Sequence, residues 1–407
     1  MMGPRAYFDH AATTPLRPEA LEAMLPFLTQ DFANPSGAHA ESRIARVALD
    51  DARDQIGALL GVGPGEVVLT SGGTEADDLA IQGGWDAVAV HGEVKGRHAA
   101  LNGGCIAPSG SPGATPVVVC AAMEHHAVLE ACRALAQRTG AVLRCVPSDA
   151  EGIVDLDALA EACDGDVRLV SVMTVNNEVG TIQPLAAAAR LVAERSPGAV
   201  LHTDAVQAVP WLDVATVTGP ADLVSISAHK FGGPKGMGAL VLRRGAQVRP
   251  RIGGGGQERG RRSGTPNVAG AVGMAAALSA TVSERAATVA RVTALRDRLA
   301  DGLSARVPGI TESGRRADRV AGILHLRVAG VEAEALVVLL DEAGIAASAG
   351  AACSSGAVEP SHVLEAMGLG AAESASGIRL SLGVATADED VDHVLERFPH
   401  VVQRLRN

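Results

Sequence analysis

Short apolar segments alternate with segments of helical period along the first 250 residues. The apolar runs, rich in β-branched residues, are EVVLTSGG, PVVVCAAMEHH, AVLRCVPSD, VRLVSVMTVNNE, AVLHTDAVQ, ADLVSISAHK and MGALVLRR. Between them lie segments such as HAVLEACRALAQRTG and LAAAARLVAERSPG, whose apolar spacing is that of an amphipathic helix. This alternation predicts an α/β fold with a mostly parallel sheet and helices on both of its faces.

The pattern changes after Asn267. An Ala-rich helical region runs from 268 to about 304, and GILHLRV, a helix at 332–342 and the final strand GIRLSLG follow it. This order predicts a smaller α+β domain in the C-terminal part of the chain. A chain of 407 residues also exceeds what one hydrophobic core usually supports. We therefore predict a large domain over 15–266 and a small domain formed by 1–14 and 267–407.

Composition and charge narrow the classes of function. The formal net charge of −11 disfavours binding to nucleic acid or to an anionic membrane. The uncharged stretch 263–283 is rich in Ala and Gly and predicts a buried helix rather than a membrane span. Six cysteines without CxxC spacing, and a start without an apolar leader, predict reduced thiols in a cytoplasmic protein. We expect most of these cysteines to be small buried hydrophobes. The segment 95–116, dense in Gly, Pro and Ser, predicts a surface loop.

Polar residues gather at the ends of the predicted strands, where α/β sheets bind their ligands. LTSGGTE breaks at Gly72 and Gly73 and opens a helix at Thr74, an arrangement that can bind phosphate. An ordinary N-cap at Thr74 would explain the same residues. HTDAVQ ends a strand at Asp204 and places Gln207 about one turn later. A carboxylate buried there needs a donor, so it is either another N-cap or the partner of a protonated ring nitrogen.

His229 and Lys230 end another apolar strand and are followed by glycines. A desolvated lysine loses proton affinity and becomes a nucleophile suited to a Schiff base. A surface lysine at the start of a loop is the alternative, which the apolar and glycine flanks disfavour. Ser225 and Ser227 share one face of the same strand and can line the same pocket.

The stretches MEHHAV and VNNEVG complete the polar set. Adjacent histidines indicate a metal only with a third ligand, and no HxxxH or CxxC accompanies them, so we predict no metal. Ring stacking or acid–base chemistry is the favoured role of these histidines. A phosphate cradle, a buried carboxylate, a nucleophilic lysine and a stacking histidine are together typical of a pyridoxal 5'-phosphate (PLP) site.

The motifs, taken in order, resemble one family. AYFDHAATTP, NPSGAH, TSGGTEADDLAI, MEHHAV, VNNEVG, HTDAVQ, SAHKFGGPKG, GGGGQERGRRSGTPN, GAACSSGAVEPSHVL and IRLSLG are similar to those of the group I cysteine desulfurases. These are the IscS/NifS-type members of the class V aminotransferases, which are fold type I PLP enzymes. The resemblance spans nearly the whole chain, and the ordered set is specific although no single motif is.

The resemblance implies a function and partners. It implies a homodimer that uses PLP to convert L-cysteine to L-alanine and leaves the sulfur as a persulfide on Cys353. It also implies a sulfur acceptor, either an iron–sulfur scaffold or a tRNA-thiolation protein. The small side chains of AASAGAACSSGA around Cys353 agree with a nucleophile carried on a loop that is not packed down.

The resemblance also implies roles for individual residues. Lys230 would be the Schiff-base lysine, His125 would stack on the ring and move protons, and Arg379 would bind the substrate carboxylate. Asn177 would lie near both the ring oxygen and the substrate. Asp204 would hold the ring nitrogen protonated, Gln207 would donate to the ring phenolate oxygen, and the phosphate would be bound by Gly73, Thr74, Ser227, His229 and, from the neighbouring subunit, Thr265.

Two kinds of alternative stay open at this point. On the same fold, the chain could be a selenocysteine lyase or a class V aminotransferase, although an aminotransferase has no need of Cys353. In another class, GGGGQERGRRSG could belong to an RNA-binding protein. The net charge of −11 and an aromatic content of 2% disfavour that function, because single-stranded RNA is bound by basic and aromatic side chains.

Overall fold

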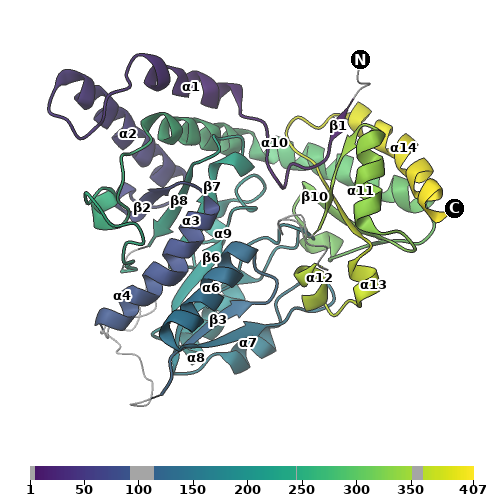
Figure 1. Cartoon of the computed structure of the whole chain (residues 1–407), viewed down its shortest axis with the longest axis horizontal. Helices are drawn as coiled ribbons and strands as arrows, with labels where there is room; N and C mark the ends of the chain where they lie inside the picture. The colour runs from purple at the N-terminus through teal and green to yellow at the C-terminus, as the bar shows by residue number, and fades with distance from the viewer. Residues whose placement is uncertain (1–4, 92–113, 244, 351–360) are drawn as a thin grey trace.

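The computed structural model describes residues 5–91, 114–243, 245–350 and 361–407 (Figure 1). Its main sheet has seven strands in the order β2-β8-β7-β6-β5-β3-β4. Strand β8 is antiparallel to both of its neighbours and the other pairs are parallel, so the predicted mostly parallel sheet is confirmed. The strands are β2 (Val67–Thr70), β3 (Val117–Ala121), β4 (Val142–Val146), β5 (Val167–Ser171), β6 (Val200–Asp204), β7 (Leu223–Ser227) and β8 (Gly238–Leu242).

Helices cover both faces of this sheet, as strand β3 illustrates. Val118 and Cys120 pack with Leu135 of α6 in one apolar cluster. Val117 and Val119, on the opposite face, belong to the main core. Burial on both faces explains why the strands are apolar throughout instead of alternating with polar residues. The helices of this part are α1 (Pro18–Thr29), α2 (Ala40–Leu59), α3 (Gly73–Asp78), α4 (Gly84–His91), α6 (His126–Thr139), α7 (Leu156–Ala162), α8 (Leu185–Arg195) and α9 (Val214–Val217).

The C-terminal part has a sheet of its own, with four antiparallel strands in the order β12-β13-β10-β9. The long helix α10 (Val268–Arg306) leads into it, and its buried first turns confirm the expected buried helix. The chain's start joins this part, because β1 (Ala6–Tyr7) pairs with β11 (Ile345–Ala346). The remaining elements are β9 (Ile310–Glu312), β10 (Ile323–Val328), α11 (Ala333–Glu342), β12 (Ser348–Ala349), α12 (His362–Ala366), α13 (Ala371–Ser374), β13 (Gly377–Ser381) and α14 (Asp388–Arg406).

Most of the described cysteines are buried, as expected. Cys120, Cys132 and Cys163 are buried, but Cys145 is exposed because β4 is an edge strand of the main sheet. Cys105 and Cys353 lie outside the described residues, as does most of the predicted loop at 95–116. No helix in the described part of the chain has the length and apolar character needed to cross a membrane.

Candidate active site

Lys230 follows the end of β7 at Ser227 by one short turn, so the strand stops three residues before the predicted end. Its Nζ donates to the carbonyl oxygens of Ala11 (2.5 Å) and Ala12 (2.9 Å), which belong to the N-terminal segment. The following Gly232 has φ +82°, and a Cβ there would lie 2.5 Å from Cγ of Arg17. Only glycine therefore lets the chain turn away from the lysine at this point.

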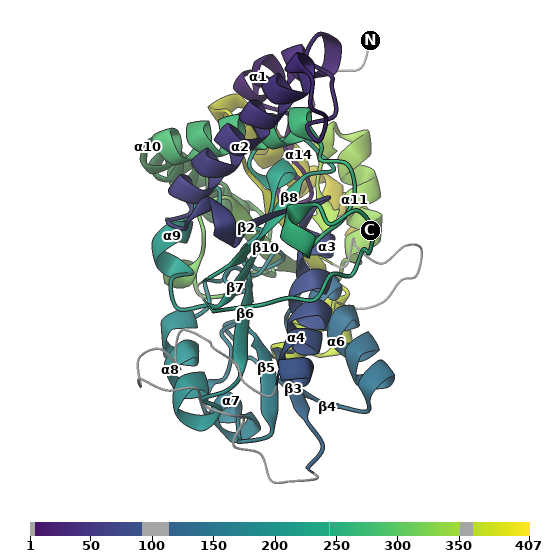
Figure 2. The ribbon, with the colours of Figure 1, turned by 90° about the vertical axis from the view of Figure 1, so that its left-hand side faces the viewer.

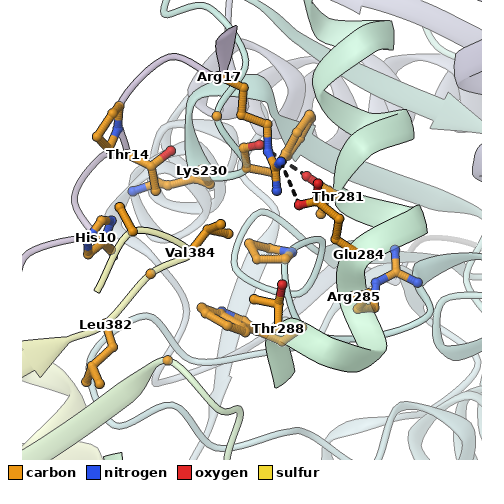
Figure 3. A pocket seen from close by; sticks show the side chains of 18 of the residues that line it. His10, Thr14, Arg17, Lys230, Thr281, Glu284, Arg285, Thr288, Leu382 and Val384 are labelled. Atoms are coloured by element: carbon orange, nitrogen blue, oxygen red, sulfur yellow. Dashed lines mark hydrogen bonds and ion pairs between the residues drawn. The ribbon is translucent and has the colours of Figure 1, made fainter. Parts of the chain in front are cut away.

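A cavity of about 340 Å³ lies against Lys230 (Figure 3). The N-terminal segment, helix α10 and the residues after β13 enclose it, and an ion pair between Arg17 and Glu284 (2.9 Å) spans one side. Trp211 and Leu382 contribute apolar lining. The lysine thus lies at the junction of the two sheets, where elements distant in sequence meet.

Asp204 ends strand β6 and is 5% exposed. Its Oδ1 accepts from the backbone N–H of Val206 (2.8 Å), and no helix begins there, so the alternative of a helix N-cap is wrong. Burial raises the pKa of Asp204 to about 6, and the positive charge of Lys230 opposes this rise. Gln207 donates from Nε2 to the Ala11 carbonyl (2.7 Å), which also accepts from Lys230. Asp204, Gln207 and Lys230 are therefore brought together at one end of the sheet.

A buried polar network lies behind Asp204, and the sequence analysis did not identify it. The Ser171 hydroxyl donates to Glu124 Oε1 (2.9 Å) and lies 2.9 Å from Nδ1 of His202. The other ring nitrogen, Nε2, lies 3.0 Å from Ser225 Oγ. Burial raises the pKa of Glu124 to about 8 and lowers that of His202 to about 3. Both groups are therefore neutral at pH 7. The available signal was His202 itself, two residues before Asp204 on the same strand.

His125 precedes helix α6 and caps it, because its Nδ1 accepts from the N–H of Ala127 (3.1 Å). Burial, with a further contribution from the charge of Lys230, lowers the pKa of His125 to about 4. The imidazole is therefore neutral at pH 7. Its neighbour His126 lies beside His362, with ring centroids 4.3 Å apart. No cluster of three potential metal-ligating side chains occurs in the described ranges.

The predicted phosphate cradle has two features of an anion site. The helix of the LTSGGTE motif begins at Gly73, so Thr74 is an exposed residue of the first turn and not the N-cap. A Cβ on Gly73 would lie 3.0 Å from Val206 Cγ2, so the backbone passes close to the end of β6. The hydroxyl of Ser227 is buried and has no hydrogen-bond partner within the described residues. Free N–H groups at a helix start and an unpaired hydroxyl together suit a phosphate.

The other two predicted phosphate residues are His229, two residues after Ser227, and Thr265. His229 Nδ1 is 3.2 Å from Thr13 Oγ1, and burial lowers the pKa of His229 to about 4. Thr265 is exposed in the segment before α10. An exposed position is what a residue needs if it is to reach a second copy of the chain.

Arg379 lies on β13 and is 4% exposed. Its guanidinium donates to the Asn177 carbonyl (2.9 Å) and to Asp9 Oδ1 (2.9 Å), while its buried Nε has no partner among the described residues. Asn177 follows β5, so this contact joins the main sheet to the small one. The structure therefore brings Arg379 and Asn177 together, as expected. Cys353 lies outside the described residues.

Comparisons with known proteins agree with this geometry. The model of the family described as aminotransferase class-V matches residues 6–94 and 105–394. An IscS-like cysteine desulfurase of Mycobacterium tuberculosis is 42% identical, with 98% of this chain and 97% of that protein covered. The cysteine desulfurase IscS of Dictyoglomus turgidum is 39% identical, with 98% and 95% covered.

A solved structure titled NifS-like protein superimposes with a TM-score of 0.87 at 32% identity, covering 98% of this chain and all of that one. The shared architecture thus extends through both sheets and the junction between them. Because the family model and these relatives span almost the entire sequence, the chain belongs to the class-V aminotransferase family of PLP-dependent enzymes.

Proposed function

We propose that the protein is a cysteine desulfurase that converts L-cysteine to L-alanine and transfers the sulfur to Cys353. The observation that carries the proposal is the grouping of Lys230 and Gln207 around the Ala11 carbonyl, with Asp204 at the end of β6 and Arg379 tied to the Asn177 carbonyl after β5. Full-length relatives about 40% identical carry the same activity in their names. The reaction balances as L-cysteine plus the Cys353 thiol giving L-alanine plus a Cys353 persulfide.

The residues present fit PLP. The unpaired hydroxyl of Ser227 and the helix start at Gly73 would bind its phosphate, and Asp204 would face its ring nitrogen. His125 would stack on the ring and Lys230 would hold the cofactor covalently. When bound, PLP supplies an electron sink for cleavage of bonds at the substrate's α-carbon.

The chain's own groups perform the remaining work. A buried carboxylate with a pKa of about 6 is ionised at pH 7, and Asp204 is then a partner for a protonated ring nitrogen. Because Nδ1 of the neutral His125 imidazole accepts from the Ala127 N–H, the ring proton is on Nε2, which is free to donate it. Arg379 is held in place by Asp9 and Asn177, so its fork is preorganised for a carboxylate. The remaining contacts to cofactor and substrate are proposed to come from Thr74, Gln207, His229 and Asn177.

Replacing the nucleophile tests the proposal. Cys353→Ser should retain PLP and still change its absorption spectrum on addition of L-cysteine, while alanine and sulfide production is lost. A serine hydroxyl is far less acidic than a thiol and cannot replace it as the sulfur acceptor. Mass spectrometry of the wild type after exposure to cysteine should show one added sulfur on the Cys353 peptide. Full activity of the variant, with sulfur added at another cysteine, would refute the assignment.

We further propose that the enzyme is a homodimer in which Thr265 binds the cofactor phosphate of the other subunit. Large apolar side chains exposed on α1, α2 and the turn between them support an interface there, because monomers rarely leave such a patch uncovered. These side chains are Leu21, Leu25, Leu28, Phe32, Ile44 and Val47.

The acceptor, compartment and domain limits complete the proposal. The persulfide would pass to an iron–sulfur scaffold or a tRNA-thiolation protein in the cytoplasm, where reducing conditions keep the Cys353 thiol free. We assign 15–266 to the large domain and 1–14 with 267–407 to the small one. The pairing of β1 with β11 supports the inclusion of the N-terminal segment in the small domain.

A further inference from the structure

The turn after β5 holds Glu178 in a fixed position. Asn176 Oδ1 accepts from the N–H groups of Glu178 (2.9 Å) and Val179 (3.0 Å), and its Nδ2 donates to the Met123 carbonyl (3.0 Å). The N–H of Gly180 also closes back onto the Asn176 carbonyl (3.1 Å). The turn is therefore closed onto Asn176, whose side chain is tied to the Met123 carbonyl after β3, and this fixes the backbone of Glu178.

One oxygen of Glu178 lies against both ends of the segment 351–360. The Ser361 hydroxyl donates to Glu178 Oε2 at 2.6 Å. A Cβ on Gly350 would lie 2.6 Å from the same oxygen, so only a glycine lets the chain pass so close to the carboxyl. Ser361 also caps α12, because its Oγ accepts from the N–H of Leu364 (3.2 Å). The two ends of the segment that contains Cys353 thus meet at one buried carboxyl group.

The groups around Glu178 include Arg379, the arginine proposed to bind the substrate carboxylate. Glu178 is 3% exposed, burial raises its pKa to about 7, and the charge of Arg379 opposes that rise. His325 lies directly opposite Arg379 in the β10–β13 register. Neither His325 nitrogen has a partner within the described residues, and a Cβ on Gly350 would be 3.5 Å from Nε2. Glu178 is therefore within reach of the charge of Arg379 as well as in contact with Ser361 and beside Gly350.

We propose that Glu178 is a positioning residue that holds Gly350 and Ser361 together beside Arg379, so that Cys353 is presented to the substrate bound at that arginine. This inference rests on the proposed role of Cys353. Fixing both ends of a connecting segment in general lowers the entropy that must be lost when a residue within it reaches a target, which is the basis of the expected effect on sulfur transfer. Glu178 itself touches neither the cofactor nor the substrate in this scheme.

The test separates sulfur transfer from substrate binding. In Glu178→Ala and Ser361→Ala, the rate of persulfide formation on Cys353 in a single turnover should fall about tenfold or more, because misplacement by about an ångström has such effects. PLP content should match the wild type, and the KM for L-cysteine should stay within about twofold, since Arg379 is intact. The double variant should be no slower than the slower single variant, because both remove one interaction.

Conservative and matched variants distinguish positioning from a purely structural role. Ser361→Thr retains a hydroxyl and should recover most of the single-turnover rate. Ser148→Ala removes a hydrogen bond to the Ala366 carbonyl (3.0 Å) at the other end of α12, and should leave that rate unchanged. If Glu178→Ala does not fold, the contrast between Ser361→Ala and Ser361→Thr decides the question.

Three results would overturn the inference. They are a wild-type persulfide rate in Ser361→Ala, an equal loss of rate in Ser148→Ala, and fully additive losses in the double variant. All three leave Cys353 as the sulfur acceptor. Activity that survives in Cys353→Ser would instead refute the proposed function, so the two failures are distinguishable.

Discussion

The two sides of the site are built in different ways. The sheet side (His125, Asp204 and Lys230) comes from the ends of strands of the main sheet or from the segments that follow them. His125 and Asp204 accept from backbone N–H groups two residues away, and Lys230 donates to the N-terminal segment. The turn side (Asn177, Glu178 and Arg379) depends on contacts between the two sheets, such as that from Arg379 to the Asn177 carbonyl. The comparison teaches that most of the residues proposed to bind the cofactor are fixed by the main sheet, whereas those proposed to bind the substrate depend on how the two parts of the molecule meet (Figures 1 and 2).

The electrostatics of the two sides differ accordingly. On the sheet side, burial drives His125 to its neutral form and keeps Glu124, behind Asp204, protonated at pH 7. On the turn side, the Arg379 guanidinium is paired with Asp9 at 2.9 Å. Variants on the sheet side should therefore lose cofactor chemistry, and variants on the turn side should lose substrate handling with the cofactor retained.

The largest expected effect is that of Lys230→Ala, which should lower activity at least about a thousandfold because the covalent nucleophile is lost. The chain has only three lysines, at positions 95, 230 and 235. After borohydride reduction of the wild type, peptide mass spectrometry should place the cofactor on Lys230. Lys235→Ala, five residues away and exposed, is the matched control and should stay active. Cofactor mass on either other lysine would contradict the placement of the sheet side.

Arg379→Ala should come next, with PLP content unchanged and kcat/KM for L-cysteine lowered by about 2–5 kcal/mol of transition-state stabilisation. Arg379→Lys keeps the charge but not the fork, and should recover little. Steady-state kinetics and cofactor absorbance measure both. An unchanged KM in Arg379→Ala, or loss of the cofactor, would contradict the assignment of substrate binding to the turn side and cofactor binding to the sheet side.

A smaller effect should appear in the pH dependence of the cofactor-free protein. The folded-state pKa of Glu124, about 8, lies above the unfolded value of 4.5, so the folded state holds a proton that the unfolded state has released. The free energy of unfolding should therefore fall as pH rises from 6.5 to 8.5, by on the order of 2 kcal/mol. Urea titrations at several pH values measure this slope.

Two variants assign that slope to its residue. Glu124→Gln should remove most of it, whereas Glu178→Gln should affect mainly the part below pH 7, since the pKa of Glu178 is about 7. Equal slopes in wild type and Glu124→Gln would show that Glu124 is not the buried acid responsible.

The smallest expected effect is that of Thr265→Val, which removes one hydrogen bond to a charged phosphate. We expect PLP affinity to weaken by about 1.5 kcal/mol, and cofactor loss to increase on dilution as the dimer dissociates. Absorbance and light scattering over a concentration series measure both. A monomer that keeps its full complement of PLP would refute a contribution from the second subunit.

The local pattern of apolar and polar residues was sufficient to predict the helices and strands and the polar residues near their ends. The apolar runs AVLHTD and ADLVSIS became β6 and β7; Asp204 is the last residue of β6 as predicted, and Lys230 follows β7 by one short turn. A run of apolar residues predicts a buried strand, and the charged residue and glycine that follow it predict where that strand ends. For the same reason, the helix of LTSGGTE was placed within one residue of its observed start at Gly73.

Only the tertiary structure decided which of these ends face one another. No local pattern indicates that β8 inserts antiparallel between β2 and β7, or that the Ala11 carbonyl accepts from both Lys230 and Gln207. The contact of Glu178 with Ser361 joins positions 183 residues apart. Periodicity records which face of an element is buried, but the partner on that face is selected by the packing of the whole chain. The sequence alone therefore determined the parts of this site, and the fold determined their assembly.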